Sequence, residues 1–155
     1  MPLLFFSCGK QSHWAFDQVH SEKKEYCSTK LSYYAKDPIH GIDLEFLQTE
    51  QHLNVYLNIH SIPVPPYRGN PKSALVTLEI AGEKLFSEAY RLEGGQRFLL
   101  PQEIADTLTW SLQSGQTVTL SLGTYRSTIA KEDFPSKFDQ LQHPFPLQNP
   151  FRLPL

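Results

Sequence analysis

The stretch IDLEFLQTEQHLNVYLNI, residues 42–59, decides the fold that we expect for this chain. Apolar and polar residues alternate along both halves, and the polar break QTEQ at 48–51 separates them. Alternation with a period of two places the apolar side chains on one face of a strand. The stretch therefore predicts a β-hairpin with one buried face, to which Leu44 and Leu57 belong.

The segments around this hairpin also read mostly as strands. LSYYA at 31–35 is short and aromatic, and residues 74–92 predict a second hairpin that turns at AGEK. The turn EGGQ precedes the apolar RFLL, and residues 117–130 alternate on both sides of Gly123. Four leucines are expected to be buried on one side of the sheet: Leu44, Leu57, Leu78 and Leu120.

Two segments change to a helical period. In residues 101–115 the apolar residues recur every three or four positions, with Pro101 at the start and Gly115 just past the end. Proline inside the start and glycine past the end are typical of a helix. Residues 131–142 predict a short helix in which Pro135 is confined to the first turn.

Together these elements predict a mainly β protein of the α+β class. We expect an antiparallel β-sandwich or open barrel of about seven strands with one or two covering helices. A chain of 155 residues suits a single domain. We divide it into a leader or lipid-tether arm at 1–30, a β-rich domain at 31–143 and a proline-rich tail at 144–155.

The composition narrows the classes of function. Hydrophobic residues make up 40% and charged residues 19%, which favours a folded protein over a disordered one. The net charge is −2, so the chain lacks the basic excess that nucleic-acid binding requires. No run reaches the roughly 18 apolar residues of a membrane-spanning helix.

The N-terminal residues FFSC, Phe5-Phe6-Ser7-Cys8, resemble the lipobox of bacterial lipoproteins. The resemblance implies that Cys8 is lipidated and that the protein is anchored in the cell envelope, in the periplasm or at the outer membrane. Phe5 stands where leucine is usual, and the residues before Cys8 include no basic segment. The alternative is that PLLFF forms a first strand of a cytoplasmic protein, with Cys8 a plain thiol.

Two cysteines are compatible with either interpretation. If Cys8 is not acylated, it and Cys27 could form a disulfide in an oxidising compartment. Neither belongs to a CxxC pair, so we expect no zinc site built on cysteine.

No motif predicts a catalytic or cofactor site. The histidines lack the i, i+2 or i, i+4 spacing that aims two imidazoles at one metal ion, and the chain contains neither GxSxG nor a glycine-rich phosphate loop. We therefore expect no metal, no cofactor and no enzyme. The alternative is a small soluble enzyme whose site the fold assembles from His40, His60, Cys27 and nearby carboxylates, with His20 a further partner for the thiol.

The sequence offers three candidate binding residues. Tyr67 and Arg68 follow the prolines of IPVPP at 62–66, which favour a polyproline conformation that can dock on a partner. The same prolines can simply stiffen a long loop, and we favour that structural role. Trp110 lies off the apolar stripe of its helix. We expect a binding or scaffolding module with an envelope protein as its partner.

Overall fold

The computed structural model describes residues 12–23 and 27–143, which form one antiparallel sheet and two helices. The strands are β1 (Trp14–Val19), β2 (Ser28–Tyr33), β3 (Asp43–Gln48), β4 (Leu53–Asn58), β5 (Ser73–Ile80), β6 (Glu83–Arg91), β7 (Arg97–Leu99), β8 (Val118–Leu122) and β9 (Tyr125–Ile129). The helices are α1 (Gln102–Gln113) and α2 (Phe134–Gln142). The strand order in the sheet is β1-β2-β3-β4-β7-β6-β5-β8-β9.

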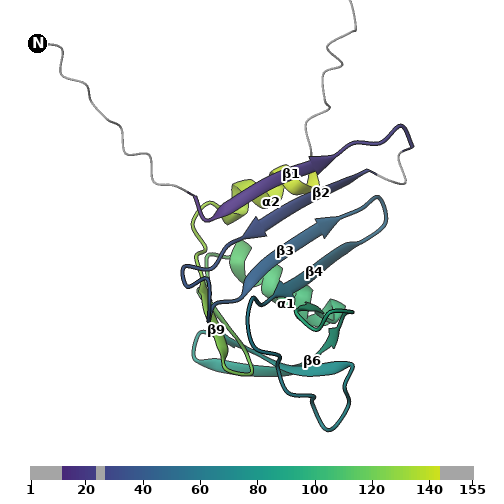
Figure 1. Ribbon diagram of the computed structural model, residues 1–155. Coiled ribbons are helices and arrows are strands. Elements are labelled where there is room, and N and C mark those ends of the chain that lie inside the picture. The colour runs from purple at the N-terminus through teal and green to yellow at the C-terminus, as the bar shows by residue number, and fades with distance from the viewer. Residues whose placement is uncertain (1–11, 24–26, 144–155) are drawn as a thin grey trace, which may run out of the picture.

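The sheet bends strongly, so that β1–β4 and the strands around β6 enclose a common interior (Figure 1). Both helices lie on the inner side, α2 behind β1 and β2, and α1 against β4 and β8. Neither of the two helices in the described residues lies on the outer face of β1–β4 (Figure 1). This arrangement confirms the mainly β, open-barrel class that the strand pattern predicts.

The hairpin that decided the prediction is present as β3 and β4. Leu44 lies opposite Leu57, and Glu45 lies opposite Tyr56 on the other face. The predicted hairpins β5–β6 and β8–β9 and both helices are confirmed as well. The four leucines expected in the core are fully buried: Leu44, Leu57, Leu78 and Leu120.

An aromatic cluster joins the sheet to α2. Its rings pack with centroid separations between 4.9 and 6.2 Å, from Trp14–Phe134 to Phe46–Phe138. Aromatic rings at such separations add stabilisation beyond the burial of their apolar area. The cluster places α2 over the inner face of the first three strands, and with it the end of the described chain.

Separate hydrogen bonds, rather than a strand ladder, connect the last strand to β1 and to the loop before β3. The Trp14 indole N–H donates to the carbonyl of Ala130 at 2.9 Å, just past β9. The backbone N–H of Ile42 donates to the Ser127 hydroxyl at 2.6 Å, and that of Arg126 donates to the carbonyl of His40 at 3.1 Å. The barrel is therefore open in its hydrogen-bond ladder but bridged by these contacts.

Two strands lie outside the prediction. β1 lies within residues 1–30, which we assigned to a leader or lipid-tether arm, and β2 begins inside the same range; residues 14–19 and 28–30 belong to the sheet instead. The alternation of β1 is hard to recognise in the sequence, because its inward face carries the polar Gln18 as well as the apolar Trp14 and Phe16. β7 is only three residues long and is defined by its pairing with β4 and β6.

Candidate functional site

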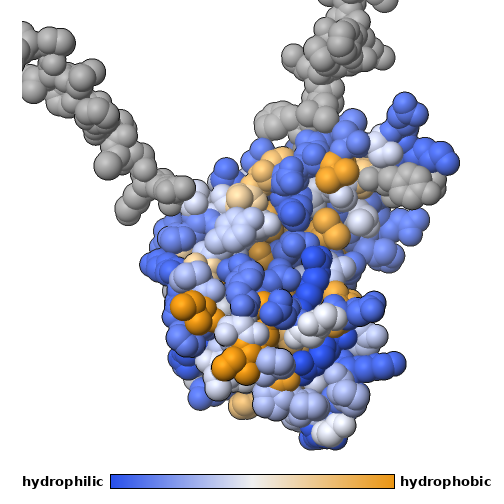
Figure 2. All heavy atoms as spheres, in the orientation of Figure 1, coloured by the Kyte–Doolittle hydropathy of each residue, from blue (hydrophilic) through white to orange (hydrophobic). Residues whose placement is uncertain are grey.

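A shallow groove of about 350 Å³ crosses the outer face of the sheet where β2, β3, β4 and β7 lie side by side. Its lining is mostly polar and charged: Lys30, Ser32, Tyr34, Asp43, Leu44, Glu45, Asn58, Ile59, His60, Gln96 and Arg97. Figure 2 shows that hydrophilic residues dominate this side of the molecule, with hydrophobic residues in small groups. We call this cavity the outer-face groove.

At one end of the outer-face groove, Asp43 holds His60. Nε2 of His60 lies 2.5 Å from Oδ2 of Asp43, while Oδ1 of Asp43 accepts the backbone N–H of Ala35 at 2.8 Å. The carboxylate is largely enclosed, and the imidazole is half exposed. Asp43 therefore fixes the orientation of an imidazole that solvent can reach.

The other end is organised around Arg97. Its guanidinium donates to Oε1 of Glu45 at 2.7 Å and stacks on the Tyr56 ring, 4.1 Å from the centroid. Glu45 is opposite Tyr56 in the sheet, so the three side chains form one unit across β3, β4 and β7. An arginine that is bonded and stacked in this way loses little freedom when a ligand binds to it.

The order of the strands does not assemble a serine triad from Ser32, His60 and Asp43 in this groove. In a serine triad the histidine lies between the serine and the carboxylate. Here Asp43 is on β3, between β2, which carries Ser32, and β4, which leads to His60. The arrangement instead offers fixed donors, acceptors and rings, which suits binding.

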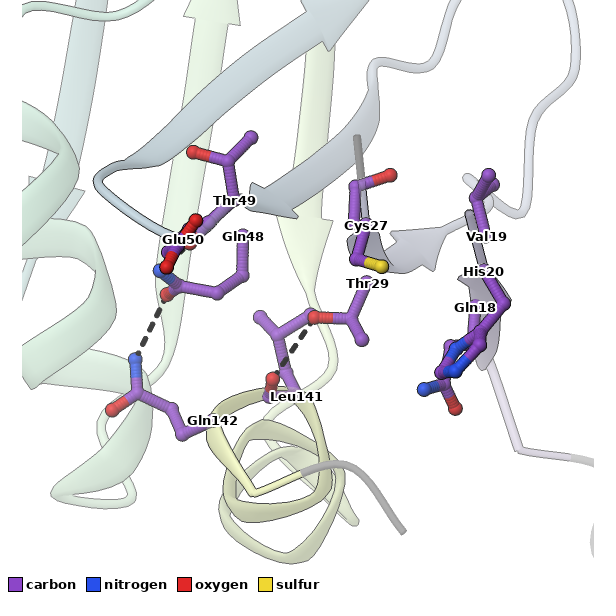
Figure 3. Close-up of a pocket in the computed structure, with 11 residues that line it drawn as sticks. Gln18, Val19, His20, Cys27, Thr29, Gln48, Thr49, Glu50, Leu141 and Gln142 are labelled. Atoms are coloured by element: carbon purple, nitrogen blue, oxygen red, sulfur yellow. Dashed lines mark hydrogen bonds between the residues drawn. The ribbon is translucent and has the colours of Figure 1, made fainter. Parts of the chain in front are cut away.

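A second cavity, of about 440 Å³, lies at the end of the sheet beside the last turn of α2 (Figure 3). His20 and Cys27 both line it, together with Glu50. The Cys27 thiol donates to the carbonyl of Ser21 at 3.4 Å and accepts the Ser21 backbone N–H at 3.5 Å. The fold thus brings His20 and Cys27 into one cavity, while the thiol bonds to the adjacent loop.

The other two histidines of the enzyme alternative, His40 and His60, do not meet Cys27. His40 contacts the carboxylate of Asp37 at 3.1 Å in the β2–β3 loop, and His60 lies in the outer-face groove. Backbone N–H donors from His40 and Ile39 lower the pKa of Asp37 below its usual 3.8. In the part of the chain that the structure describes, no three His, Cys, Asp or Glu side chains gather to hold a metal ion.

The proline loop has two distinct halves. Val64 is buried, its carbonyl accepts from Arg91 at 2.5 Å, and the carbonyl of Ile62 accepts the Tyr125 hydroxyl at 2.7 Å. Tyr67 and Arg68 lie further along, where the arginine stacks on the tyrosine ring at 5.1 Å. The first half anchors the loop to β6 and β9, and the second half carries this stacked pair.

The other candidate residues lie apart from these features or outside the described residues. Trp110 is 63% exposed on α1, consistent with its place off the apolar stripe. Cys8, with the lipobox-like segment, and the tail at 144–155 fall outside the residues that the structure describes. Neither α1 nor α2 is long and apolar enough to cross a membrane, and the described residues contain no other helix.

The sequence reasoning missed the groove itself. The predicted hairpin places Glu45 on the polar face of its strand, beside Tyr56. Arg97 reaches them only through the pairing of β4 with β7, which no local pattern indicates. Comparisons with protein-family models, curated proteins and solved structures found no match for this chain.

Proposed function

We propose that this protein is a binding or scaffolding module of the bacterial cell envelope, tethered through a lipidated Cys8. The outer face of the sheet serves as its contact surface, and an envelope protein is its partner. Binding of this kind needs no catalytic step, no cofactor and no metal ion.

The observation that supports this proposal most is the outer-face groove. Tyrosine and arginine dominate the energetics of protein interfaces, and here Tyr34, Tyr56 and Arg97 lie on one uncovered face. Tyr34 is 57% exposed and therefore available to a partner. Because Glu45 and Tyr56 already hold Arg97, a partner would spend little free energy on ordering it.

The lipid tether is tested in the native bacterium. We expect the protein to partition into detergent and to incorporate labelled fatty acid, and Cys8→Ala to abolish both. A Cys27→Ala variant is the matched control, because it removes the other thiol and keeps the lipobox-like residues. Labelling that survives Cys8→Ala would refute the tether.

The contact surface is tested by crosslinking and capture of the partner. Tyr34→Ala with Lys30→Ala changes two groove side chains that make no hydrogen bond within the described residues, and we expect it to reduce capture at an unchanged melting temperature. Trp110→Ala removes an equally exposed aromatic side chain from α1 and is the control. Loss of capture in the Trp110 variant alone would place the contact on α1 and overturn the assignment to the groove.

One observation favours a second candidate, a small thiol enzyme, since His20 and Cys27 line the same cavity. Turnover of an activated ester that disappears in both Cys27→Ser and His20→Ala would support it. If Cys27→Ser keeps the capture of the partner and no turnover is found, the binding module stands.

A further inference from the structure

Among the strands that the structure describes, β1 forms one open edge of the sheet. The carbonyl of His13 accepts the N–H of Tyr34 at 3.3 Å, and Trp14 lies opposite Tyr33. In an antiparallel pair, residues alternate between those bonded to the neighbour and those whose backbone groups face the other edge. Trp14, Phe16 and Gln18 therefore turn their N–H and C=O groups toward the open edge.

Nearby side chains accept hydrogen bonds from only some of the backbone N–H groups along this edge. The N–H of Trp14 donates to the Ser12 hydroxyl at 3.2 Å, and that of Gln18 donates to the Asp17 carboxylate at 2.8 Å. Within residues 12–23 and 27–143, the backbone groups of Phe16 have no such partner. An open row of backbone donors and acceptors is a template for another strand.

The residues that face the open edge also point into the protein. Trp14 is 3% exposed, and Phe16 is partly buried against the core. A strand added at this edge would therefore place the residues that bond to Trp14 and Phe16 with their side chains on the inner face. Such a strand needs apolar side chains and free N–H groups at the same alternate positions.

The tail PFPLQNPFRLPL, residues 144–155, has this pattern in its sequence. All four prolines occupy even positions: Pro144, Pro146, Pro150 and Pro154. The apolar residues that are not proline all occupy odd positions: Phe145, Leu147, Phe151, Leu153 and Leu155. In an extended strand, alternate residues share both a face and a hydrogen-bonding edge, and proline lacks the N–H. The odd residues thus carry a full set of donors, and all of them except Asn149 are apolar.

The end of α2, after which this tail follows in the sequence, lies beside β1. Leu141 and Gln142 line the same cavity as Gln18 and Val19, at the carboxyl end of β1 (Figure 3). A chain that leaves this point can run back along β1 in the antiparallel sense without a crossover connection. Twelve extended residues reach up to about 40 Å, and a six-residue strand needs only about 20 Å.

We propose that residues 145–153 add to the open edge of β1 as a tenth, antiparallel strand. Odd-numbered tail residues pair with Trp14, Phe16 and Gln18 and extend the inner apolar face. The prolines face the new outer edge, where their missing N–H groups prevent the addition of any further strand. This inference is independent of the proposed envelope function.

The test compares two neighbouring proline substitutions in the full chain. Asn149→Pro removes an N–H at an odd position, and Gln148→Pro adds a proline at an even position, in phase with those already present. Amide hydrogen exchange is measured by NMR at Phe16. We expect exchange to be at least about tenfold slower in the unaltered chain and in Gln148→Pro than in Asn149→Pro.

Three other outcomes would each contradict the pairing of the tail with β1. Fast exchange at Phe16 in all three proteins would overturn the proposal, because the edge would be open. Slow exchange in all three would mean that another segment, such as residues 3–7, covers it. Protection that appears only as the protein concentration rises would assign the edge to a second copy of the chain.

Discussion

The hydroxyl of Tyr33 donates a hydrogen bond to the backbone carbonyl of Thr128, 3.2 Å away, across 95 positions of sequence. The same oxygen accepts the backbone N–H of Ala130 at 3.4 Å. A buried side chain on β2 thereby satisfies one backbone group of β9 and one just past its end, and among the described strands β9 has a neighbour on one side only. Tyr33 is a structural bridge across the opening of the barrel.

Tyr33→Phe removes this bridge and keeps the ring in the aromatic cluster. We expect a loss of about 1–3 kcal/mol in the free energy of unfolding, because it leaves a carbonyl and an N–H without their partner. Denaturant unfolding at pH 7 measures the loss. Tyr34→Phe, on the neighbouring exposed tyrosine, is the control and should change the free energy by less than about 0.5 kcal/mol.

The difference in unfolding free energy between the unaltered protein and Tyr33→Phe should depend on pH. Burial raises the pKa of the Tyr33 phenol above its ordinary 10.0. The unfolded chain then loses this proton near pH 10, and the folded chain loses it only at higher pH. The stability contributed by Tyr33 is therefore complete below pH 10 and declines as the pH rises through the raised value. Unfolding curves between pH 7 and 11 should show the Tyr33→Phe deficit narrowing above pH 10, and a constant deficit would contradict this.

The core prediction is tested by a pair of adjacent substitutions on β8. Leu120→Ala empties a fully buried position and should cost about 2–5 kcal/mol. Thr119→Ala changes the outer face and should cost less than about 1 kcal/mol, because the Thr119 and Thr128 hydroxyls share an exposed hydrogen bond. Equal losses in chemical denaturation would show that the faces of this strand are assigned wrongly.

Gly41 is required for a different reason from the glycines in turns. A Cβ at this position would lie 2.4 Å from both the Ala35 Cβ and the Asp37 carbonyl oxygen, which forces the loop to move. Gly82 has a φ of +81° and open space around it, so alanine there costs only about 1–2 kcal/mol of backbone strain. We expect Gly41→Ala to lower the melting temperature more than Gly82→Ala, and a reversed order would rule out steric exclusion as the cause.

The two halves of the proline loop should respond separately. Val64→Ala removes a buried side chain and should cost about 1–3 kcal/mol. The Tyr67→Ala, Arg68→Ala double variant removes a surface stack and should lower the melting temperature less. Thermal unfolding of both variants distinguishes the halves; a larger fall in the double variant would mean that Tyr67 and Arg68 carry the structural role.

Most of the fold could be predicted because local periodicity determines it. Each predicted hairpin joins strands that are consecutive in sequence, and their alternation and turn residues are visible together. β1 could not be predicted in this way, because the polar Gln18 on its inward face weakens the alternation of apolar and polar residues. β7 could not be predicted either, because three residues are too few to show a period of two. Its pairing with β4 and β6 defines it as a strand.

The candidate site was harder to predict because its parts come from distant segments. His60 was named from its residue type, and its partner Asp43 lies 17 positions earlier on a neighbouring strand. Glu45 and Arg97 are 52 positions apart. Local pattern places each residue on a face of a strand, and only the order of the strands in the sheet brings the residues together.

The contact between Trp14 and Ala130 bears on how the chain folds during synthesis. β1 to β4 pair in the order in which they are made, so this part can form while the rest is still being translated. The Trp14 indole can form its hydrogen bond only after Ala130 has been made, 116 residues later. Closing a loop of that length has a high cost in conformational entropy. We expect the nascent protein to pass through a half-barrel stage, in which the aromatic side chains of the first strands are exposed until α2 and residue 130 emerge.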